Sequence, residues 1–136
     1  MSVKSNPFKE LSNLIDKYAE NKDNYDVENL QSIREDISLC LFYLSSDYAK
    51  AISNFDRADW ERKRNYAELI EQNKYAEDGS KNTVVQIESL ARIANKEKEE
   101  EVVEAIRQKE RARLIVSSTT QILNAISSKI QQLNKH

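Results

Sequence analysis

The sequence predicts an all-α protein, because turn-forming residues are nearly absent and apolar residues recur with helical spacing. There is one Gly and one Pro in 136 residues, so the turns that a sheet of short strands needs are missing. Residues 84–133 contain neither. In that stretch small or apolar side chains recur at alternating intervals of three and four residues. This is the heptad spacing of helices that pack along a seam. We therefore expect a coiled-coil-like, oligomeric protein.

The seam lies on one face of the helix expected at residues 83–133. Its members are Val84, Ile87, Ala91, Ala94, Val102, Ala105, Ala112, Val116, Thr119, Leu123, Ile126, Ile130 and Leu133. Lys98 and Lys109 interrupt the pattern. Between Ala94 and Val102 the interruption inserts four residues, a stutter that locally unwinds a left-handed supercoil.

A single helical domain is expected over residues 1–136, since one domain usually holds roughly 100 to 200 residues. A short helix over residues 8–20 follows Asn6-Pro7, because Pro is tolerated in a first helical turn. The polar segment 21–24 then favours a break. A long helix is expected over residues 26–76. Its densest apolar part, from Ile37 to Leu44, is the expected centre of the core.

Residues 77–82 are expected to form the turn of a long antiparallel helical hairpin. Gly79 suits the positive φ that often follows a helix, and Asn82 or Thr83 suits the N-cap of the next helix. Folding back at this turn places residues 62–64 opposite roughly residues 94–98, because antiparallel partners are about equidistant from the turn.

The charge is small in total but unevenly distributed. The formal net charge is −2, which excludes a strongly basic coat for duplex DNA. Residues 1–56 carry six Lys or Arg against ten Asp or Glu, whereas residues 57–136 carry fifteen against thirteen. Any anion-binding surface is therefore expected in the C-terminal part.

A cytoplasmic location without membrane partners is expected. No apolar run approaches the roughly 18 residues that span a bilayer, and residues 1–10 lack the apolar core of a secretory signal. The single cysteine, Cys40, lies between two leucines in a helical pattern. It suits a reducing compartment, and we expect a small buried hydrophobic residue rather than a nucleophile.

No catalytic, cofactor or metal site is expected, and the protein is predicted not to be an enzyme. The only histidine is His136, so an internal imidazole base is missing. One glycine cannot build a phosphate-binding loop of the usual kind. The acidic residues between Glu97 and Glu104 occupy successive helix positions that point in different directions, which favours a solvated face over a metal cage.

One stretch combines cations with aromatic rings, as a surface for single-stranded nucleic acid does. The candidate residues are Arg57, Trp60, Arg62, Lys63, Arg64 and Tyr66. Acidic residues such as Asp59 and Glu61 are interleaved with them, so a solvated helix in which Trp60 and Tyr66 pack against neighbours is the alternative interpretation. A second basic cluster contains Arg107, Lys109, Arg111 and Arg113, and acidic residues of the same helix are available to pair with it.

Residues 114–133 form the expected assembly element, because the segment is weakly charged and its apolar face is wider than one seam. The candidate oligomerisation residues are Val116, Leu123, Ile126, Ile130 and Leu133. Self-association is favoured over binding to a membrane surface, since basic flanks and interfacial aromatic residues are sparse.

From residue 55 to residue 133 the organisation resembles the UvsY-type recombination mediators, small helical proteins encoded in the recombination clusters of tailed phages. The features that resemble this family are Arg62-Lys63-Arg64-Asn65-Tyr66, the loop containing Gly79, and the helix ending in the segment 121–130.

The resemblance implies a non-enzymatic factor that forms a ring-like homo-oligomer and binds single-stranded DNA in a host bacterial cytoplasm. Its implied protein partners are a recombinase and a single-strand-binding protein that the recombinase displaces. On this reading residues 62–64 contact phosphates, Tyr66 stacks on a base, and the C-terminal helix assembles subunits. The competing class is a structural coiled coil without a nucleic-acid ligand, such as an assembly chaperone or an inhibitor of another protein.

Overall fold

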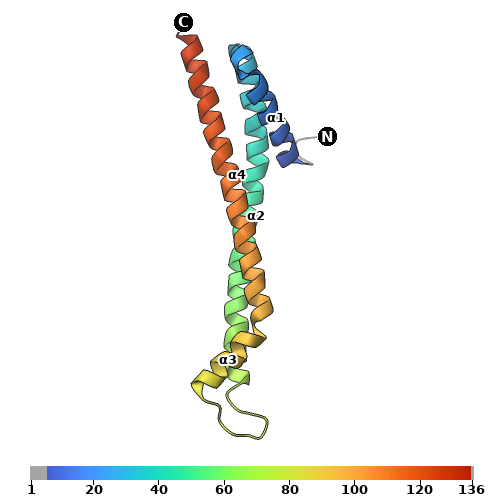
Figure 1. Ribbon diagram of the computed structural model, residues 1–136, viewed down its shortest axis with the longest axis vertical. Coiled ribbons are helices and arrows are strands. Elements are labelled where there is room, and N and C mark those ends of the chain that lie inside the picture. The colour runs from blue at the N-terminus through green and yellow to red at the C-terminus, as the bar shows by residue number, and fades with distance from the viewer. Residues whose placement is uncertain (1–5, 136) are drawn as a thin grey trace. The chain divides into compact units, whose positions relative to one another are not determined.

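The computed structural model describes residues 6–135 and is all-α over that range, as predicted (Figure 1). Its elements are α1 (Pro7–Asn21), a short 3-10 helix η1 (Lys22–Asn24), α2 (Val27–Gln72), α3 (Val84–Ala94) and α4 (Lys96–Asn134). The described residues form no strand, and one isolated bridge joins Tyr75 to Lys81. Each of the two long helices packs against other helices.

α1, α2 and α3 begin at capping residues near the helix starts that the sequence indicates. The Asn6 side chain accepts a hydrogen bond from the Lys9 backbone N–H at 3.1 Å, with Pro7 in the first turn of α1. At the start of α2, the Asp26 side chain accepts a hydrogen bond from the Asn29 backbone N–H at 2.8 Å. At α3, Thr83 and Gln86 form a reciprocal capping box. These side chains satisfy backbone donors that lack partners in a first helical turn.

The first long helix ends earlier than expected, at Gln72 instead of residue 76. The Asn73 side chain donates a hydrogen bond to the Leu69 carbonyl at 2.7 Å, and the Asn82 side chain donates to the Asn73 carbonyl at 2.8 Å. The Leu69 carbonyl also keeps its helical bond from the Asn73 backbone N–H at 3.1 Å. The Asn73 carbonyl is therefore the group for which a side chain, that of Asn82, supplies the donor that further helix would have provided. Gly79 has φ 85°, the positive value expected for it, but it lies within the loop and not directly after the helix.

The expected helix over residues 83–133 is two helices, α3 and α4, separated by Asn95. Asn95 has φ −90° and ψ 2°, outside the helical range. Its N–H still donates to the Ala91 carbonyl, and its carbonyl accepts from the Glu99 N–H. Because both backbone groups stay paired, the change of direction leaves neither of them without a hydrogen bond.

The chain packs as two compact units, each containing part of both long helices. Unit 1 comprises residues up to 49 together with those from 111, and unit 2 comprises residues 50–110. In unit 1, α1 lies beside the first part of α2, and the last part of α4 completes a three-helix packing (Figure 1).

Unit 1 contains the main apolar core. Its buried members are Leu11, Leu14, Leu30, Ile33, Ile37, Cys40, Leu44, Ile126 and Ile130. The prediction that Ile37 to Leu44 contributes to the centre is confirmed, and Cys40 is fully buried, as expected. Burial, followed by the nearby Glu10 and Asp36 carboxylates, raises the pKa of the Cys40 thiol. The thiolate that a nucleophile requires is therefore disfavoured.

Unit 2 has a much smaller interior. Its buried residues are Ala91, Asn95 and Val102. Several apolar side chains of α3 point to solvent instead: Val84, Val85 and Ile93 are 69%, 72% and 74% exposed. No helix within the described range is long and apolar enough to cross a membrane.

Ile37→Ala should lower the free energy of unfolding by about 2–5 kcal/mol, because Ile37 is fully buried and the shorter side chain leaves a cavity. Urea denaturation followed by circular dichroism measures the change. Ile93→Ala is the matched control, since Ile93 is 74% exposed, and should change stability by less than about 0.5 kcal/mol. Equal effects of the two substitutions would contradict the placement of the core.

Candidate nucleic-acid interface

The six candidate DNA-binding residues all lie on the second half of α2, within unit 2. They divide between two environments. Arg57, Trp60, Lys63 and Arg64 are exposed, whereas Arg62 and Tyr66 are half-buried. No helix breaker occurs between residues 56 and 66, and oppositely charged side chains three or four places apart support the helix locally.

Asp59 neutralises two of the candidate cations. Its carboxylate accepts from the Arg62 guanidinium at 2.7 Å and contacts the Lys63 ammonium at 3.0 Å. The hydrogen bond from Arg62, followed by that from Lys63, lowers the pKa of Asp59 below its usual value. The same bond to Asp59 raises the pKa of Arg62. Arg62 also lies 3.6 Å from the Glu99 carboxylate of α4, so its charge is largely used within the protein.

Trp60 presents an aromatic surface bracketed by cations. It is 57% exposed, and the Arg64 guanidinium carbon lies 4.9 Å from its ring centroid. Arg57 is exposed and has no hydrogen-bond or ion-pair partner among residues 6–135. Spacings of three and four residues place these side chains on one helix face. We call Arg57, Trp60 and Arg64 the Trp60 stripe.

The Trp60 stripe is not free of opposing charge, because Glu68 lies one turn beyond Arg64. The Arg64 Nε is 3.6 Å from a Glu68 carboxylate oxygen, and both side chains are more than half exposed. An exposed pair of this kind contributes little stability. A competing phosphate can therefore replace Glu68 as the partner of Arg64 at low cost.

A buried amide pair fixes this part of α2 against the junction of α3 and α4. The Asn65 Nδ2 donates to the Asn95 Oδ1 at 2.6 Å, and the Asn95 Nδ2 donates to the Arg62 carbonyl at 3.3 Å. Asn95 is fully buried, so each of these bonds replaces hydration that burial removes. Sequence reasoning missed this residue, although the irregular step between Ala94 and Val102 marks its neighbourhood.

The two lysines that interrupt the heptad seam also contact α2. The Lys98 ammonium lies 3.7 Å from Glu61 and 3.5 Å from Glu101. The Lys109 ammonium lies 4.0 Å from the centroid of the Phe55 ring. Both lysines therefore make polar contacts between helices of unit 2. A regular heptad seam would have a buried hydrocarbon side chain at each of these positions.

The second basic cluster is largely paired. Arg107 donates to Glu104 at 2.6 Å, and the Arg111 guanidinium lies 5.8 Å from the Phe8 ring centroid in unit 1. Arg113 also has an interaction partner. The acidic residues nearby pair with basic ones, for example Glu100 with Lys96 at 4.0 Å. Within the described range, His, Cys, Asp and Glu form no group of three that could hold a metal ion.

The predicted assembly residues are mostly used inside the chain itself. Ile126 and Ile130 are 0% and 5% exposed, and both belong to the core of unit 1. Val116 and Leu123 are partly buried against the same core. Leu133 is 41% exposed. Of these five residues it is the one whose side chain is most available to another molecule.

Comparison of the chain with protein-family models, with curated proteins and with solved structures finds no match.

Asn95→Ala should destabilise the protein by about 1–3 kcal/mol, because the Asn65 amide loses its buried acceptor. Thermal and urea unfolding measure the loss. Asn124→Ala, at an exposed position of α4, is the control and should be neutral or slightly stabilising, since Ala favours helix. A double-mutant cycle with Asn65→Ala should show coupling between the two sites, and strict additivity would contradict the amide pair.

Proposed function

We propose that the protein is a non-enzymatic factor that binds single-stranded DNA as an oligomer and assists recombinase loading, as a recombination mediator does. The observation that carries the proposal is the Trp60 stripe. A tryptophan that is 57% exposed, with arginines before and after it on one helix face, offers a base-stacking ring between two phosphate-binding groups.

The stripe suits single strands better than duplex DNA. A base of a single strand is free to stack on an exposed ring, and stacking tolerates any sequence. A duplex buries its base faces, and reading its grooves requires several unpaired cations and polar side chains. Arg62 and Lys63 are both paired with Asp59, so few cations near Trp60 are unpaired. A single stripe is therefore a weak site that gains strength when an oligomer repeats it.

The proposal includes an antiparallel pairing of α2 with α3 and α4, which presents the stripe on a supported helix. The order of contacts in unit 2 supports it: Phe55 meets Lys109, Glu61 meets Lys98, and Asn65 meets Asn95. The implied protein partners, a recombinase and a single-strand-binding protein, come from the resemblance alone.

Arg57→Gln/Arg64→Gln should weaken binding to a fluorescent oligo-dT and reduce the salt dependence of the binding constant. Losing two phosphate contacts lowers the slope of log K against log salt by roughly 1.4. Trp60→Ala should weaken binding roughly 5- to 150-fold with little change of slope, because stacking releases no counterions. Lys17→Gln/Lys22→Gln removes the same charge from exposed positions of α1 and η1 and serves as the control. If the control weakens binding equally, net charge and not the stripe is responsible.

Asp59→Asn should strengthen binding, because it releases Arg62 and Lys63 from the shared carboxylate and removes a negative charge beside the stripe. The salt slope should become steeper by roughly 0.7 for each released cation that reaches a phosphate. Fluorescence anisotropy titrations at several salt concentrations measure both effects. Glu20→Gln, which removes a carboxylate from α1, is the charge-matched control. Weaker or unchanged binding by Asp59→Asn alone would place the DNA elsewhere.

A structural or protein-interaction factor without a nucleic-acid ligand is the second candidate, and the apolar surface of α3 favours it. Val84, Val85 and Ile93 are each more than two-thirds exposed on an 11-residue helix. Exposed apolar patches commonly mark contacts with other proteins. An oligomer that fails to bind oligo-dT at low salt would favour this candidate over the DNA-binding one.

A further inference from the structure

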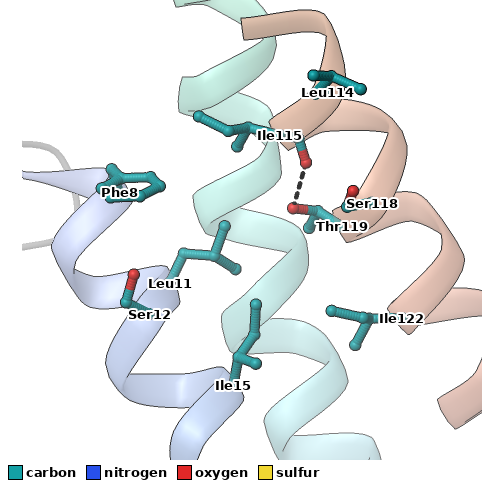
Figure 2. A pocket seen from close by; sticks show the side chains of 9 residues that line it. All are labelled: Phe8, Leu11, Ser12, Ile15, Leu114, Ile115, Ser118, Thr119 and Ile122. Carbon is teal, nitrogen blue, oxygen red and sulfur yellow. Dashed lines mark hydrogen bonds between the residues drawn. The ribbon is translucent and has the colours of Figure 1, made fainter. Parts of the chain in front are cut away.

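Unit 1 carries an apolar groove that its own helices leave open. Figure 2 shows α1 as one wall and α4 as the other, with α2 behind them. The groove has a volume of about 250 Å³. Phe8, Leu11 and Ile15 line one wall, and Leu114, Ile115 and Ile122 line the other. Phe8 and Leu114 are 44% and 54% exposed, so burying the rim against a partner would release water from large apolar side chains.

A ridge of apolar side chains stands on the opposite face of the unit. Leu39 and Phe42 of α2 are 47% and 68% exposed. At about 100° per residue they lie on the reverse side of the helix from the core stripe that contains Ile37 and Leu44. Because the core stripe of α2 packs against α1 and α4, the ridge on the reverse side of α2 faces away from these two helices, which form the walls of the groove.

The two surfaces carry complementary charge. The ridge continues along the same helix face into Glu35 and Glu28, both exposed at heptad spacing from Phe42. The α4 wall has the opposite character, because residues 111–135 contain four Lys or Arg and no Asp or Glu. Arg111 marks one end of the groove, with its guanidinium 5.8 Å from the Phe8 ring centroid. The α1 rim is mixed, carrying Lys9 and Asp16.

We propose that the groove of one copy of this chain receives the Leu39–Phe42 ridge of a second copy, with Glu35 of the ridge beside Arg111. The inference rests on the oligomer of the proposed function and names its contact surfaces. In this contact Phe42 of the second copy lies between Ile15 and Ile122 of the first. Glu35 lies about 10 Å from Phe42 along α2 of the second copy, and Arg111 lies about 16 Å from Ile122 along α4 of the first. The lengths of the two side chains bridge the difference.

Such a contact is head-to-tail, because each copy uses two different surfaces. Repetition of one head-to-tail contact produces a closed ring when the rotation between copies fits, and an open filament when it does not. Either product repeats the Trp60 stripe once per copy. The core residues Ile126 and Ile130 then stay inside each subunit, which agrees with their burial there.

Phe42→Glu and Ser118→Tyr test the two surfaces separately by light scattering coupled to size exclusion over a range of concentrations. Phe42→Glu places a charge on the ridge, and Ser118→Tyr fills the groove from its α4 wall. Each should raise the dissociation constant of the oligomer roughly 30-fold or more, the loss expected for an aromatic anchor. Unchanged helicity by circular dichroism verifies folding. Ile93→Glu, on the exposed face of α3, is the matched control and should leave assembly intact.

Charge reversal tests the orientation. Glu35→Arg and Arg111→Glu should each weaken the oligomer, and the double variant should restore it, because the exchanged charges attract again. Failure of the double variant to recover would overturn the pairing of these two residues.

The remaining outcomes separate the two proposals. If Ile93→Glu dissociates the oligomer while Phe42→Glu does not, the contact is made by α3 and the ridge proposal is wrong. If the wild type is a monomer at every concentration, both the contact and the oligomer of the proposed function fail. If Phe42→Glu remains oligomeric while Arg57→Gln/Arg64→Gln loses binding to oligo-dT, the DNA-binding proposal stands and the contact proposal is overturned.

Discussion

Burial of the apolar stripe of α2 in unit 1 is the constraint on which the rest of the structure depends. A helix of 46 residues with many charged side chains gains most of its stability from packing and little from its intrinsic propensity. Leu30, Ile37 and Ile126 supply that packing, because they are fully buried where α2 meets α4 and α1. The short helix α1 is needed because two helices alone would leave one side of this apolar cluster open to water.

Unit 2 is held together by a different kind of contact. Its helices meet through the Asn65–Asn95 amide pair, through ion pairs such as Glu61–Lys98, and through Lys109 beside the Phe55 ring. Exposed ion pairs contribute little free energy, but they select one arrangement by charge. The Trp60 stripe is available on this unit because few apolar side chains of α2 are needed there for packing.

Local residue chemistry made much of the fold predictable. The scarcity of Gly and Pro predicted the helical class, and the apolar density around Ile37 predicted the core. Asn82 or Thr83 was the expected N-cap of the helix after the turn, and Thr83 is the cap of α3. The break at Asn95 was missed, because its amide partner, Asn65, lies 30 residues away in the sequence and no local pattern reveals that pairing. For the candidate site, the residue types were readable from the sequence, but their pairing was not. Asp59 lies close enough in sequence to pair with Arg62 and Lys63. The exposure of Arg57, Trp60 and Arg64, however, depends on which face of α2 packs against α3 and α4.

The unequal interiors of the two units also set how the protein moves. Amide hydrogens exchange with solvent through local openings whose free energy follows the apolar burial and hydrogen bonding of each segment. Unit 1 cannot open without exposing its leucines and isoleucines, whereas unit 2 exposes mainly groups that water solvates well. We therefore expect backbone amides between residues 50 and 110 to exchange through low-energy openings, and those around Ile37 and Ile126 to exchange only on near-global unfolding. The surface proposed to meet DNA thus belongs to the part of the chain that adjusts its shape at least cost.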